Sequence, residues 1–492
     1  MMHAVSDTRH LINGKRVPGE GAAFGVVSPG TGLVFTELTG ASVPQFEAAI
    51  LAARQAFDGG PWRDLGRKDR IGLVREFVSY LRGQRERLIE LAVLEAGCPV
   101  ASPIMHSQVD GPLQQASDVI ELFEQLPEFD PNPVPFRDRI NRQGKVLQSL
   151  RRYVPVGVVA GISAYNFPFH TSLWKTIPAL LAGNTLVLRP SPLTPLHALI
   201  LAEAAQAAGL PNGVVNILLE ADREGGVLLS THHAIDMVAF TGSSAVGVQV
   251  MQQAAPTMKR LQLELGGKSA QIYLPDAIEE ARTAAAMVCF AHAGQGCALG
   301  TRIFVPEAAK PALLDAMAAA VSGAVLGDPA DPRTTMGPVV SAAQRDRCQK
   351  YVDLAVAGGA RVVCGGSPPP SLPNGFFFQP TILDVPDNNN PAARDEIFGP
   401  VVSVIGYRDL DHAVEMANDS DYGLSGWIFG RDTNAAVNVA SRIRTGTVNI
   451  NGGYATAFSS SGGFKMSGIG RERGVEGLRV FQQIQVLNVH SL

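Results

Sequence analysis

The sequence predicts an α/β protein made of two α/β units that are joined by bridging strands. Three observations support this fold class. Between residues 155 and 262, short apolar stretches alternate with segments of helical periodicity, and the same alternation begins again after residue 262. Two further segments, 139–154 and 482–490, alternate polar and apolar residues as half-exposed strands do. Alternating strands and helices are typical of a doubly wound parallel sheet, which binds its ligand at the carboxyl ends of the strands.

The N-terminal part is predicted to be helical. Residues 44–57 and 68–96 are expected to form helices, and the second is long and amphipathic because its apolar residues recur at helical spacing. The proline-rich segment 128–137 is expected to be an extended connector. It leads into the alternating segment 139–154, whose exposed strands predict a contact with another subunit, together with the tail 482–490.

The two α/β units are expected to contain the following elements. The first has strands at 156–162, 185–188, 214–219 and 237–240, and helices at 172–182, 196–208 and 224–230. The second has strands at 269–274, 302–305, 361–364 and 401–407, and helices at 276–290 and 306–321. The expected domains are a Rossmann-like cofactor domain (1–136 and 156–262), a catalytic domain (263–455), and an oligomerisation arm with the C-terminal tail (137–155 and 456–492).

Composition excludes several classes of protein. The chain has 492 residues, 46% hydrophobic and 17% charged, as expected for roughly two to four globular domains. A net charge of −4 argues against nucleic acid or an anionic membrane as a partner. The five widely spaced cysteines contain no Cys-x-x-Cys, which fits a reducing cytoplasm, and the histidines show no spacing that predicts a metal site. No run of about 18 apolar residues predicts a membrane span.

A cysteine and a glutamate, each close to glycines, are the strongest chemical signal. Cys297 ends the motif Gly294-Gln-Gly-Cys, and Glu264 begins the motif Glu-Leu-Gly-Gly-Lys268. A thiol nucleophile and a carboxylate base are the two groups that oxidise an aldehyde through a thioester. Each residue type is common, so this pair gains its weight from the motifs around it.

Two strand ends offer candidate ligand contacts. Gly242 and Ser243 follow an apolar strand and precede a helical segment, where free backbone N–H groups can hold a pyrophosphate; the alternative is that Ser243 only caps the helix. No Gly-x-Gly-x-x-Gly occurs at this junction. Asn166 follows another apolar strand and could donate to an oxyanion, an effect of roughly 3 kcal/mol, or could be a turn residue before a proline.

Seven motifs in order resemble the aldehyde dehydrogenase superfamily, in its non-phosphorylating, hydrolytic branch. They are Asn166-Phe-Pro-Phe, the run from Trp174 to Ser191, Phe240-Thr-Gly-Ser-Ser, Glu264-Leu-Gly-Gly-Lys-Ser, Gly294-Gln-Gly-Cys, Glu396-Ile-Phe-Gly-Pro and Gly462-Gly-Phe-Lys-Met-Ser-Gly. They span about residues 155 to 475, and the flanking segments extend the resemblance over nearly the entire chain.

The resemblance implies a role for each matching residue. Cys297 is the nucleophile, Asn166 forms the oxyanion hole with the backbone N–H of Cys297, and Glu264 activates the water that hydrolyses the thioester. The cofactor is NAD or NADP, and Glu396 binds its nicotinamide ribose. The implied cofactor-binding residues are Ser163, Lys175, Arg189, Ser191, Gly242, Ser243, Glu396 and Phe398. No metal is implied, and the oligomer is expected to be a homodimer or homotetramer.

One departure from the family pattern concerns the choice between NAD and NADP. Many members read Lys-Pro-Ser-Glu where this chain reads Arg189-Pro-Ser-Pro192. The missing carboxylate would otherwise repel a 2′-phosphate, whose charge is about −2. Glu220 stands where many members carry a glycine and could restore a negative charge near the ribose. The sequence does not locate Glu220, so both nucleotides remain possible.

The substrate is expected to be a neutral, apolar or aromatic aldehyde. The residues beside Cys297 are small or aliphatic, and no arginine adjoins them to bind a carboxylated semialdehyde. Five aromatic residues either line an apolar tunnel or belong to the core: Tyr165, Phe169, Trp174, Tyr454 and Phe458. Two alternative functions are a CoA-acylating semialdehyde dehydrogenase, which usually lacks the carboxylate of Glu264, and a catalytically silent structural protein on the same fold.

Overall fold

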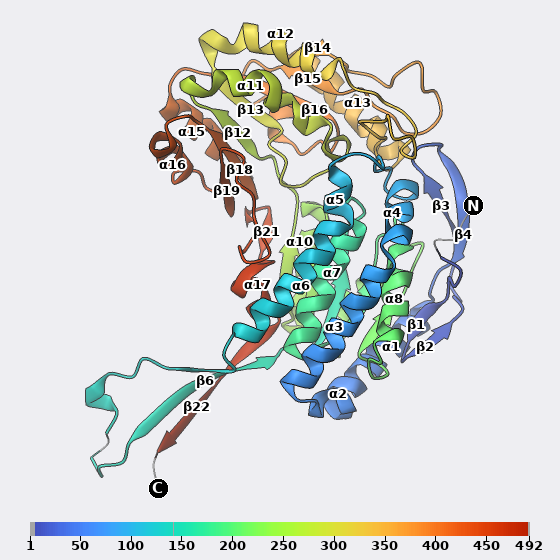
Figure 1. Cartoon of the computed structure of the whole chain (residues 1–492), viewed down its shortest axis with the longest axis vertical. Helices are drawn as coiled ribbons and strands as arrows, with labels where there is room; N and C mark the ends of the chain where they lie inside the picture. Colours follow the sequence, from blue (N-terminus) through green and yellow to red (C-terminus); the bar gives the residue numbers. More distant parts are fainter. Residues whose placement is uncertain (1–4, 141, 491–492) are drawn as a thin grey trace.

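The computed structural model describes residues 5–140 and 142–490 and confirms the α/β class. Two large, mostly parallel sheets form the two lobes of the molecule (Figure 1). The first sheet has the order β2-β1-β9-β8-β7-β10-β11-β21. Its parallel strands are β7 (Val158–Ile162), β8 (Thr185–Arg189), β9 (Val215–Ile217), β10 (Met237–Thr241) and β11 (Arg260–Glu264). Its antiparallel edge strands are β1 (His10–Ile12), β2 (Lys15–Val17) and β21 (Gly468–Ile469).

Alternating side chains of the first sheet supply two cores, one on each face. On β7, Val158 and Ala160 pack with the core under α1 (Val43–Gly59) and α9 (Glu224–Thr231), while Val159 belongs to the opposite core. The second face is covered by α3 (Arg67–Gly83), α6 (Asp110–Gln125), α7 (Pro168–Ala182) and α8 (His197–Ala207). Strands buried on both faces are nearly continuous apolar runs, which is why this region was recognisable in the sequence.

The second lobe repeats this arrangement with different strands. Its sheet has the order β14-β15-β16-β13-β12-β18-β19. The strands are β12 (Ala270–Tyr273), β13 (Arg302–Pro306), β14 (Arg361–Cys364), β15 (Thr381–Asp384), β16 (Val401–Tyr407), β18 (Ser425–Phe429) and β19 (Thr447–Ile450). One face packs against α11 (Ile278–Ala284) and α12 (Lys310–Val321), and the other against α13 (Ala342–Ala357), α15 (Leu410–Asn418) and α16 (Thr433–Ala440).

Two predicted helices are divided in the structure. The helix predicted over 68–96 breaks after Gly83, so that α3 is followed by the separate helix α4 (Arg85–Leu94). Gln84 has φ −101° and ψ 13°, and its N–H bonds back to the carbonyl of Leu81, which tightens the last turn. The helix predicted over 276–290 is regular only in α11 and continues as a 3₁₀ segment, 285–289.

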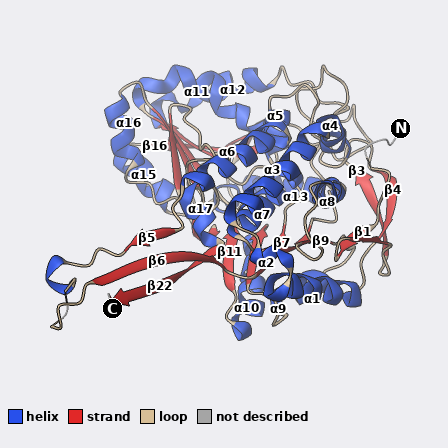
Figure 2. Cartoon of the chain, turned by 60° about the horizontal axis from the view of Figure 1, so that its bottom comes forward, coloured by secondary structure: helices blue, strands red, loops and turns tan. Residues whose placement is uncertain are grey.

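The predicted arm projects from the body as a three-stranded sheet (Figure 2). Its strands are β5 (Phe129–Pro131), β6 (Leu147–Pro155) and β22 (Gln482–His490), and β6 and β22 pair in register along their whole length. Several apolar side chains on β22 are about half exposed, including Ile484, Val486 and Val489. Within the segment predicted as arm and tail, β21 joins the first sheet and α17 (Gly474–Val480) packs against α6 and α7.

A short link between the two lobes positions the site. Strand β11 ends the parallel part of the first sheet at Glu264, and β12 starts in the middle of the second sheet at Ala270. Only residues 265–269 lie between them. The carboxyl ends of the first sheet therefore face the second lobe. Within residues 5–140 and 142–490, no helix is long and apolar enough to cross a membrane.

The α-helices and strands not yet named complete the description. They are β3 (Ala23–Ser28), β4 (Leu33–Thr39), β17 (Tyr422–Gly423), β20 (Phe464–Lys465), α2 (Pro61–Asp64), α5 (Ile104–Gln108), α10 (Ser244–Ala254) and α14 (Pro391–Arg394).

Candidate active site

Cys297 lies in a loop whose backbone is tightly specified. Three consecutive residues before it, His292, Ala293 and Gly294, have φ of 52°, 50° and 72°, in the left-handed region. A Cβ at Gly294 would lie 2.0 Å from the carbonyl oxygen of Gly399, so only glycine fits there. The fully buried side chain of Gln295 anchors the loop, because its Oε1 accepts from the N–H of Val340 over 2.9 Å. The Cys297 thiol that follows is partly buried.

Asn166 is brought to this loop from the other lobe. It follows β7 and precedes α7, and its Nδ2 donates to the carbonyl of Gln295 over 2.8 Å. Its own carbonyl accepts from Nε2 of Gln108 over 2.8 Å. The amide nitrogen has two hydrogens, and the bond to Gln295 uses one of them. Asn166 is therefore held in a fixed orientation beside the thiol loop with a second N–H to donate.

Glu264 ends β11 with an incompletely bonded carboxylate. Its Oε1 is buried and finds no hydrogen-bond donor among the residues that the structure describes. Burial and the negative charge of Glu472 raise the pKa of Glu264 well above 4.5, although Lys175, Arg471 and Arg473 act in the opposite direction. A buried carboxylate short of donors and with a raised pKa is suited to accept a proton from water.

Burial and nearby carboxylates together raise the pKa of the Cys297 thiol to about 12. The carboxylates that contribute are Glu396, Glu264 and Glu472. This electrostatic coupling places Cys297 near both of the carboxylates that the sequence had assigned to catalysis and to ribose binding. It also means that the thiol is protonated at neutral pH, so that a positive charge or a base must assist its ionisation.

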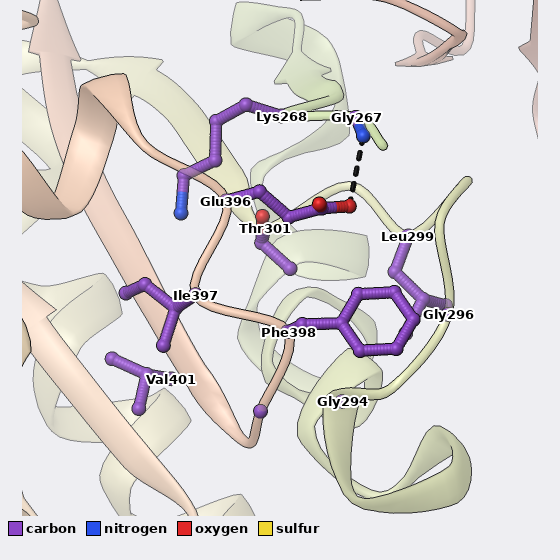
Figure 3. Close-up of a pocket in the computed structure, with 11 residues that line it drawn as sticks. Gly267, Lys268, Gly294, Gly296, Leu299, Thr301, Glu396, Ile397, Phe398 and Val401 are labelled. Atoms are coloured by element: carbon purple, nitrogen blue, oxygen red, sulfur yellow. Dashed lines mark hydrogen bonds between the residues drawn. The ribbon is translucent and has the colours of Figure 1, made fainter. Parts of the chain in front are cut away.

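Glu396 lies in a pocket that opens beside the thiol loop (Figure 3). Its Oε1 accepts from the N–H of Gly267 over 2.9 Å. A Cβ at Gly266 would lie 2.2 Å from the Glu396 carboxylate, so this glycine lets the carboxylate approach the link between the lobes. Phe398 has φ of 62°, and its ring lies toward Gly296 in Figure 3. The remaining lining residues are Lys268, Gly294, Leu299, Thr301, Ile397, Gly399 and Val401.

Lys175 is buried on α7 and connects three segments. Its Nζ donates to Oγ1 of Thr241, at the end of β10, over 2.5 Å. It also pairs with Oε1 of Glu472 over 3.3 Å. The lysine therefore balances part of the negative charge that surrounds Glu264 and Cys297.

The other predicted cofactor residues follow the carboxyl ends of β7, β8 and β10. Ser163 is buried, and its hydroxyl accepts from Ser172 over 2.9 Å. Gly242 donates its N–H to the Glu264 carbonyl over 3.1 Å. The hydroxyl of Ser243 caps α10 by accepting from the N–H of Val246, which is one of the two interpretations weighed from the sequence.

Arg189 and Ser191 lie at the end of β8, with a partner that the sequence could not place. Nε of Arg189 donates to the carboxylate of Glu220 over 2.6 Å. The hydroxyl of Ser191 accepts from the N–H of Leu193 over 3.3 Å. These two residues therefore belong to the β8–β9 side of the sheet, whereas Lys175, Gly242 and Glu264 gather at β10 and β11.

Sequence reasoning missed a partly buried arginine near the thiol. Arg473 interacts electrostatically with Cys297, Glu264 and Glu472. Its Nη2 lies 3.1 Å from Nε2 of His170, and its guanidinium lies over the ring of Trp174 at 5.3 Å from the centroid. The expectation that no arginine adjoins the site was therefore wrong. Arg473 is 176 residues from Cys297 in the chain, and no local pattern links them.

The five aromatic residues have different environments. Phe169 and Trp174 are buried, at 3% and 5% exposure, whereas Tyr454 and Phe458 are 80% and 52% exposed. Tyr165 packs edge-on against Phe398, with ring centroids 5.9 Å apart. Among the described residues, no group of three or more His, Cys, Asp or Glu side chains could hold a metal ion.

Comparison with known proteins extends over nearly the whole chain. A family model described as the aldehyde dehydrogenase family matches residues 17–487. Among curated proteins, a geranial dehydrogenase from Castellaniella defragrans is 40% identical over 453 residues, which cover 91% of this chain and 92% of that protein.

Solved structures show the same fold. A mutant of aldehyde dehydrogenase C from Pseudomonas syringae, in complex with NAD+ and octanal, matches with a TM-score of 0.91 and 33% identity, covering 98% of this chain and 96% of that one. An NAD+ complex of an aldehyde dehydrogenase from Bacillus cereus matches with a TM-score of 0.92 and 33% identity, over 98% and 96% of the two chains.

Proposed function

Since the chain belongs to the aldehyde dehydrogenase family, we propose that Cys297, Asn166 and Glu264 carry out its oxidation of an aldehyde to a carboxylic acid with NAD+ or NADP+. One observation carries this assignment. Nδ2 of Asn166, from the first lobe, donates over 2.8 Å to the carbonyl of Gln295, two residues before Cys297 in the second lobe, and the negative charges of Glu264 and Glu396 raise the pKa of the Cys297 thiol. This arrangement supports a single site for the proposed nucleophile, the proposed base and the proposed ribose-binding carboxylate.

The residues at this edge fit a nicotinamide dinucleotide. Helix α10 begins at Ser244, two residues after Gly242, and a Cβ at Gly242 would lie 2.4 Å from the ring of Phe240, so a larger residue does not fit at this approach to the helix. Backbone N–H groups at such a helix start suit a pyrophosphate. The carboxylate of Glu396 can accept from ribose hydroxyls. When bound, the nicotinamide accepts the hydride that leaves the aldehyde carbon.

The first half of the reaction is assigned to Cys297 and Asn166. The Cys297 sulfur, as a thiolate, forms a bond to the carbonyl carbon, and the carbonyl oxygen becomes an oxyanion. The second N–H of the Asn166 amide and the backbone N–H of Cys297 stabilise that oxyanion, which is worth roughly 3 kcal/mol per donor in comparable sites. Loss of hydride from the carbon then leaves a thioester on Cys297.

The second half is assigned to Glu264. Its carboxylate takes a proton from water, the water oxygen bonds to the thioester carbon, and the carbon–sulfur bond breaks. The Cys297 sulfur leaves as thiolate, and the acid product departs. The unpartnered Oε1 of Glu264 supports this role, because it has a free acceptor position for a water molecule.

The proposed substrate is a neutral, apolar aldehyde. The named relatives act on or bind geranial and octanal, and the partly buried Phe167, next to Asn166 in the chain, offers apolar surface there. Arg473 favours a second candidate, a semialdehyde with a carboxylate. Comparing kcat/KM for octanal and for succinic semialdehyde separates the two, because a guanidinium that binds substrate would favour the second by more than about tenfold.

The arm supports a homo-oligomer, either a dimer or a tetramer, and the division into cofactor domain, catalytic domain and arm is part of the same proposal. Exposed apolar side chains on β22 have no cover within the described chain, and such an edge is ready to pair with another sheet. Deleting residues 482–492 is expected to reduce the mass measured by light scattering. An unchanged mass would contradict the role of the arm.

Five free thiols favour a cytoplasmic location.

The decisive experiment is a panel of aliphatic, aromatic and semialdehyde substrates with each nucleotide, followed by the absorbance of the reduced nicotinamide. Production of free acid supports the hydrolytic reaction. If CoA were needed and acyl-CoA accumulated, the CoA-acylating alternative would replace it. If no aldehyde reduced either nucleotide, the chain would be a silent member of the family.

A further inference from the structure

The carboxyl ends of β8 and β9 bring a buried ion pair to the edge of the first sheet. Arg189 is the last residue of β8, and Glu220 lies just beyond the end of β9. Nε of Arg189 donates to Oε1 of Glu220 over 2.6 Å. The side chain of Glu220 is 1% exposed and that of Arg189 is 12% exposed. The ion pair is therefore a buried part of this edge and not an exposed surface ion pair.

The carboxylate of Glu220 also accepts hydrogen bonds from the first turn of helix α9. Its Oε2 accepts from the N–H of Gly225 over 2.8 Å, and its Oε1 accepts from the N–H of Gly226 over 3.1 Å. Nη2 of Arg189 donates in turn to the carbonyl of Asp222 over 2.9 Å. A carboxylate has about four acceptor positions, and three of those on Glu220 are filled. The helix N–H groups and the guanidinium are thus directed at Glu220.

These are the same donors that a phosphate would need. Ligands of an open parallel sheet bind outside the carboxyl ends of its strands, and a nucleotide 2′-phosphate is bound there by an arginine or by free N–H groups at a helix start. Both kinds of donor are already engaged. The surrounding charges add to the effect, because Asp222 and Glu224 are exposed beside Arg223, so the acids outnumber the bases.

We propose that Glu220 makes the enzyme select NAD+ over NADP+, by neutralising Arg189 and filling the anion site at the start of α9. The proposal rests on the proposed function only in that the nucleotide binds along this edge. It assigns to Glu220 the discrimination that Pro192 cannot provide. Because Glu220 is buried, it acts as a positioning residue through Arg189 and the helix, and the ribose need not contact it.

Binding of two adenosine nucleotides tests the proposal without any catalysis. The probes are 5′-AMP and adenosine 2′,5′-bisphosphate, titrated into the full-length protein by isothermal calorimetry. The wild-type protein is expected to bind 5′-AMP at least about tenfold more tightly. Glu220→Gln keeps the size of the side chain and removes its charge, and it should strengthen binding of the bisphosphate by at least about tenfold while AMP changes by less than about threefold.

A second substitution tests which group binds the 2′-phosphate in the Glu220→Gln variant. Adding Arg189→Gln to Glu220→Gln should remove the gain, because the released guanidinium is the expected partner of the 2′-phosphate. Equal binding of both probes by the wild type, or an unchanged ratio in Glu220→Gln, would overturn the proposal. A gain that persists in the double variant would overturn the role of Arg189.

Asp222→Asn is the matched control, since it neutralises an exposed carboxylate two residues away. Its ratio of affinities should change by less than about threefold, and a change as large as that of Glu220→Gln would reduce the effect to general surface charge. If Glu220→Gln does not fold, as judged by circular dichroism, Glu220→Asp decides instead: it keeps the charge and must keep the preference for AMP.

Steady-state kinetics connects the binding result to the reaction. With octanal, the ratio of kcat/KM for NAD+ to that for NADP+ should fall in Glu220→Gln by at least about tenfold, through the KM for NADP+ and not through kcat. If no aldehyde reduces either nucleotide, the proposed function fails, whereas the two probe affinities still decide the role of Glu220.

Discussion

Two carboxylates at the carboxyl edge of the first sheet differ in how completely they are hydrogen-bonded. Glu264 ends β11 with an oxygen that no described donor reaches, whereas Glu220, beyond β9, accepts from Arg189, Gly225 and Gly226. Burial raises the pKa of both. The second largest cause of the pKa shift differs between them. For Glu264 it is the negative charge of Glu472, which raises the pKa further, and for Glu220 it is the positive charge of Arg189, which lowers it. An under-bonded carboxylate is available for proton transfer, and a saturated one is a fixed charge.

The largest expected effect comes from the nucleophile that shares the surroundings of Glu264. Cys297→Ala should lower aldehyde oxidation by at least about ten-thousand-fold, because it removes the sulfur on which the proposed thioester forms. The measurement is the steady-state rate with octanal and NAD+. Cys364→Ala is the control, since Cys364 is also a partly buried free thiol but lies on β14. A similar loss in both variants would mean general damage to the fold.

Removing the base should separate the two halves of the reaction. Glu264→Gln should lower steady-state turnover by about a hundred- to a thousandfold, since water loses its proton acceptor. The first burst of reduced nicotinamide should keep its amplitude, because hydride transfer precedes hydrolysis. Rapid-mixing absorbance measures both quantities. A variant with the full steady-state rate would exclude Glu264 as the base.

The raised thiol pKa predicts a steep pH dependence in the nucleotide-free protein. Because the pKa of Cys297 is raised to about 12, the thiolate is a minor form at pH 7, and its fraction should rise about tenfold per pH unit up to pH 10. The rate of Cys297 alkylation by iodoacetamide, followed by peptide mass spectrometry, measures this fraction. A rate that levels off below pH 9 would show that the surroundings stabilise the thiolate.

Stability measurements compare the two carboxylates directly. Glu220→Gln should lower the free energy of unfolding by about 1–3 kcal/mol, because leaving the Arg189 guanidinium without its charged partner costs more than the amide regains by avoiding the burial that raises the pKa of Glu220. Glu264→Gln should cost less than about 0.5 kcal/mol at pH 8. The sign follows from the raised pKa of Glu264, because the folded protein favours the protonated acid. As the pH rises above 4.5, the unfolded chain ionises first, and stability falls until the folded carboxyl ionises too. The neutral amide avoids that loss. Urea denaturation tests both, and equal losses would contradict the contrast.

The smallest expected effects have opposite signs. Glu472→Gln removes a negative charge that raises the pKa of Glu264 and of Cys297, so the pH profile of turnover should move to lower pH by up to about one unit. Arg473→Gln removes a positive charge that lowers the pKa of Glu264 and should move the profile to higher pH. Shifts in the same direction would mean that packing, and not charge, controls the base.

Local sequence patterns predicted the fold class, and they predicted those elements whose limits depend on neighbouring residues. The strand 482–490 forms with the predicted limits because its alternation is uninterrupted. The long helix did not, because Gly83 and Gln84 allow a turn that the apolar spacing does not reveal. The ordered motifs indicated Cys297 and Glu264 as the proposed reacting groups, since each motif is a short run of neighbouring residues.

Contacts between distant segments could not be predicted in this way. The pairing of Arg189 with Glu220 depends on β8 and β9 being neighbours in the sheet, which single-strand patterns do not specify. Arg473 and Glu472 reach the site from a loop that follows β21, about two hundred residues after Glu264. Electrostatic surroundings of this kind arise from tertiary packing, so pKa shifts were beyond sequence reasoning even where the residues were identified.

The five residues that join β11 to β12 tie the two lobes together at the site. Glu264 stands at one end of this link, and the N–H of Gly267 in its middle bonds Glu396 of the second lobe. The spacing between Glu264 and Glu396 is therefore set by a few backbone residues and one hydrogen bond across the junction of the two lobes.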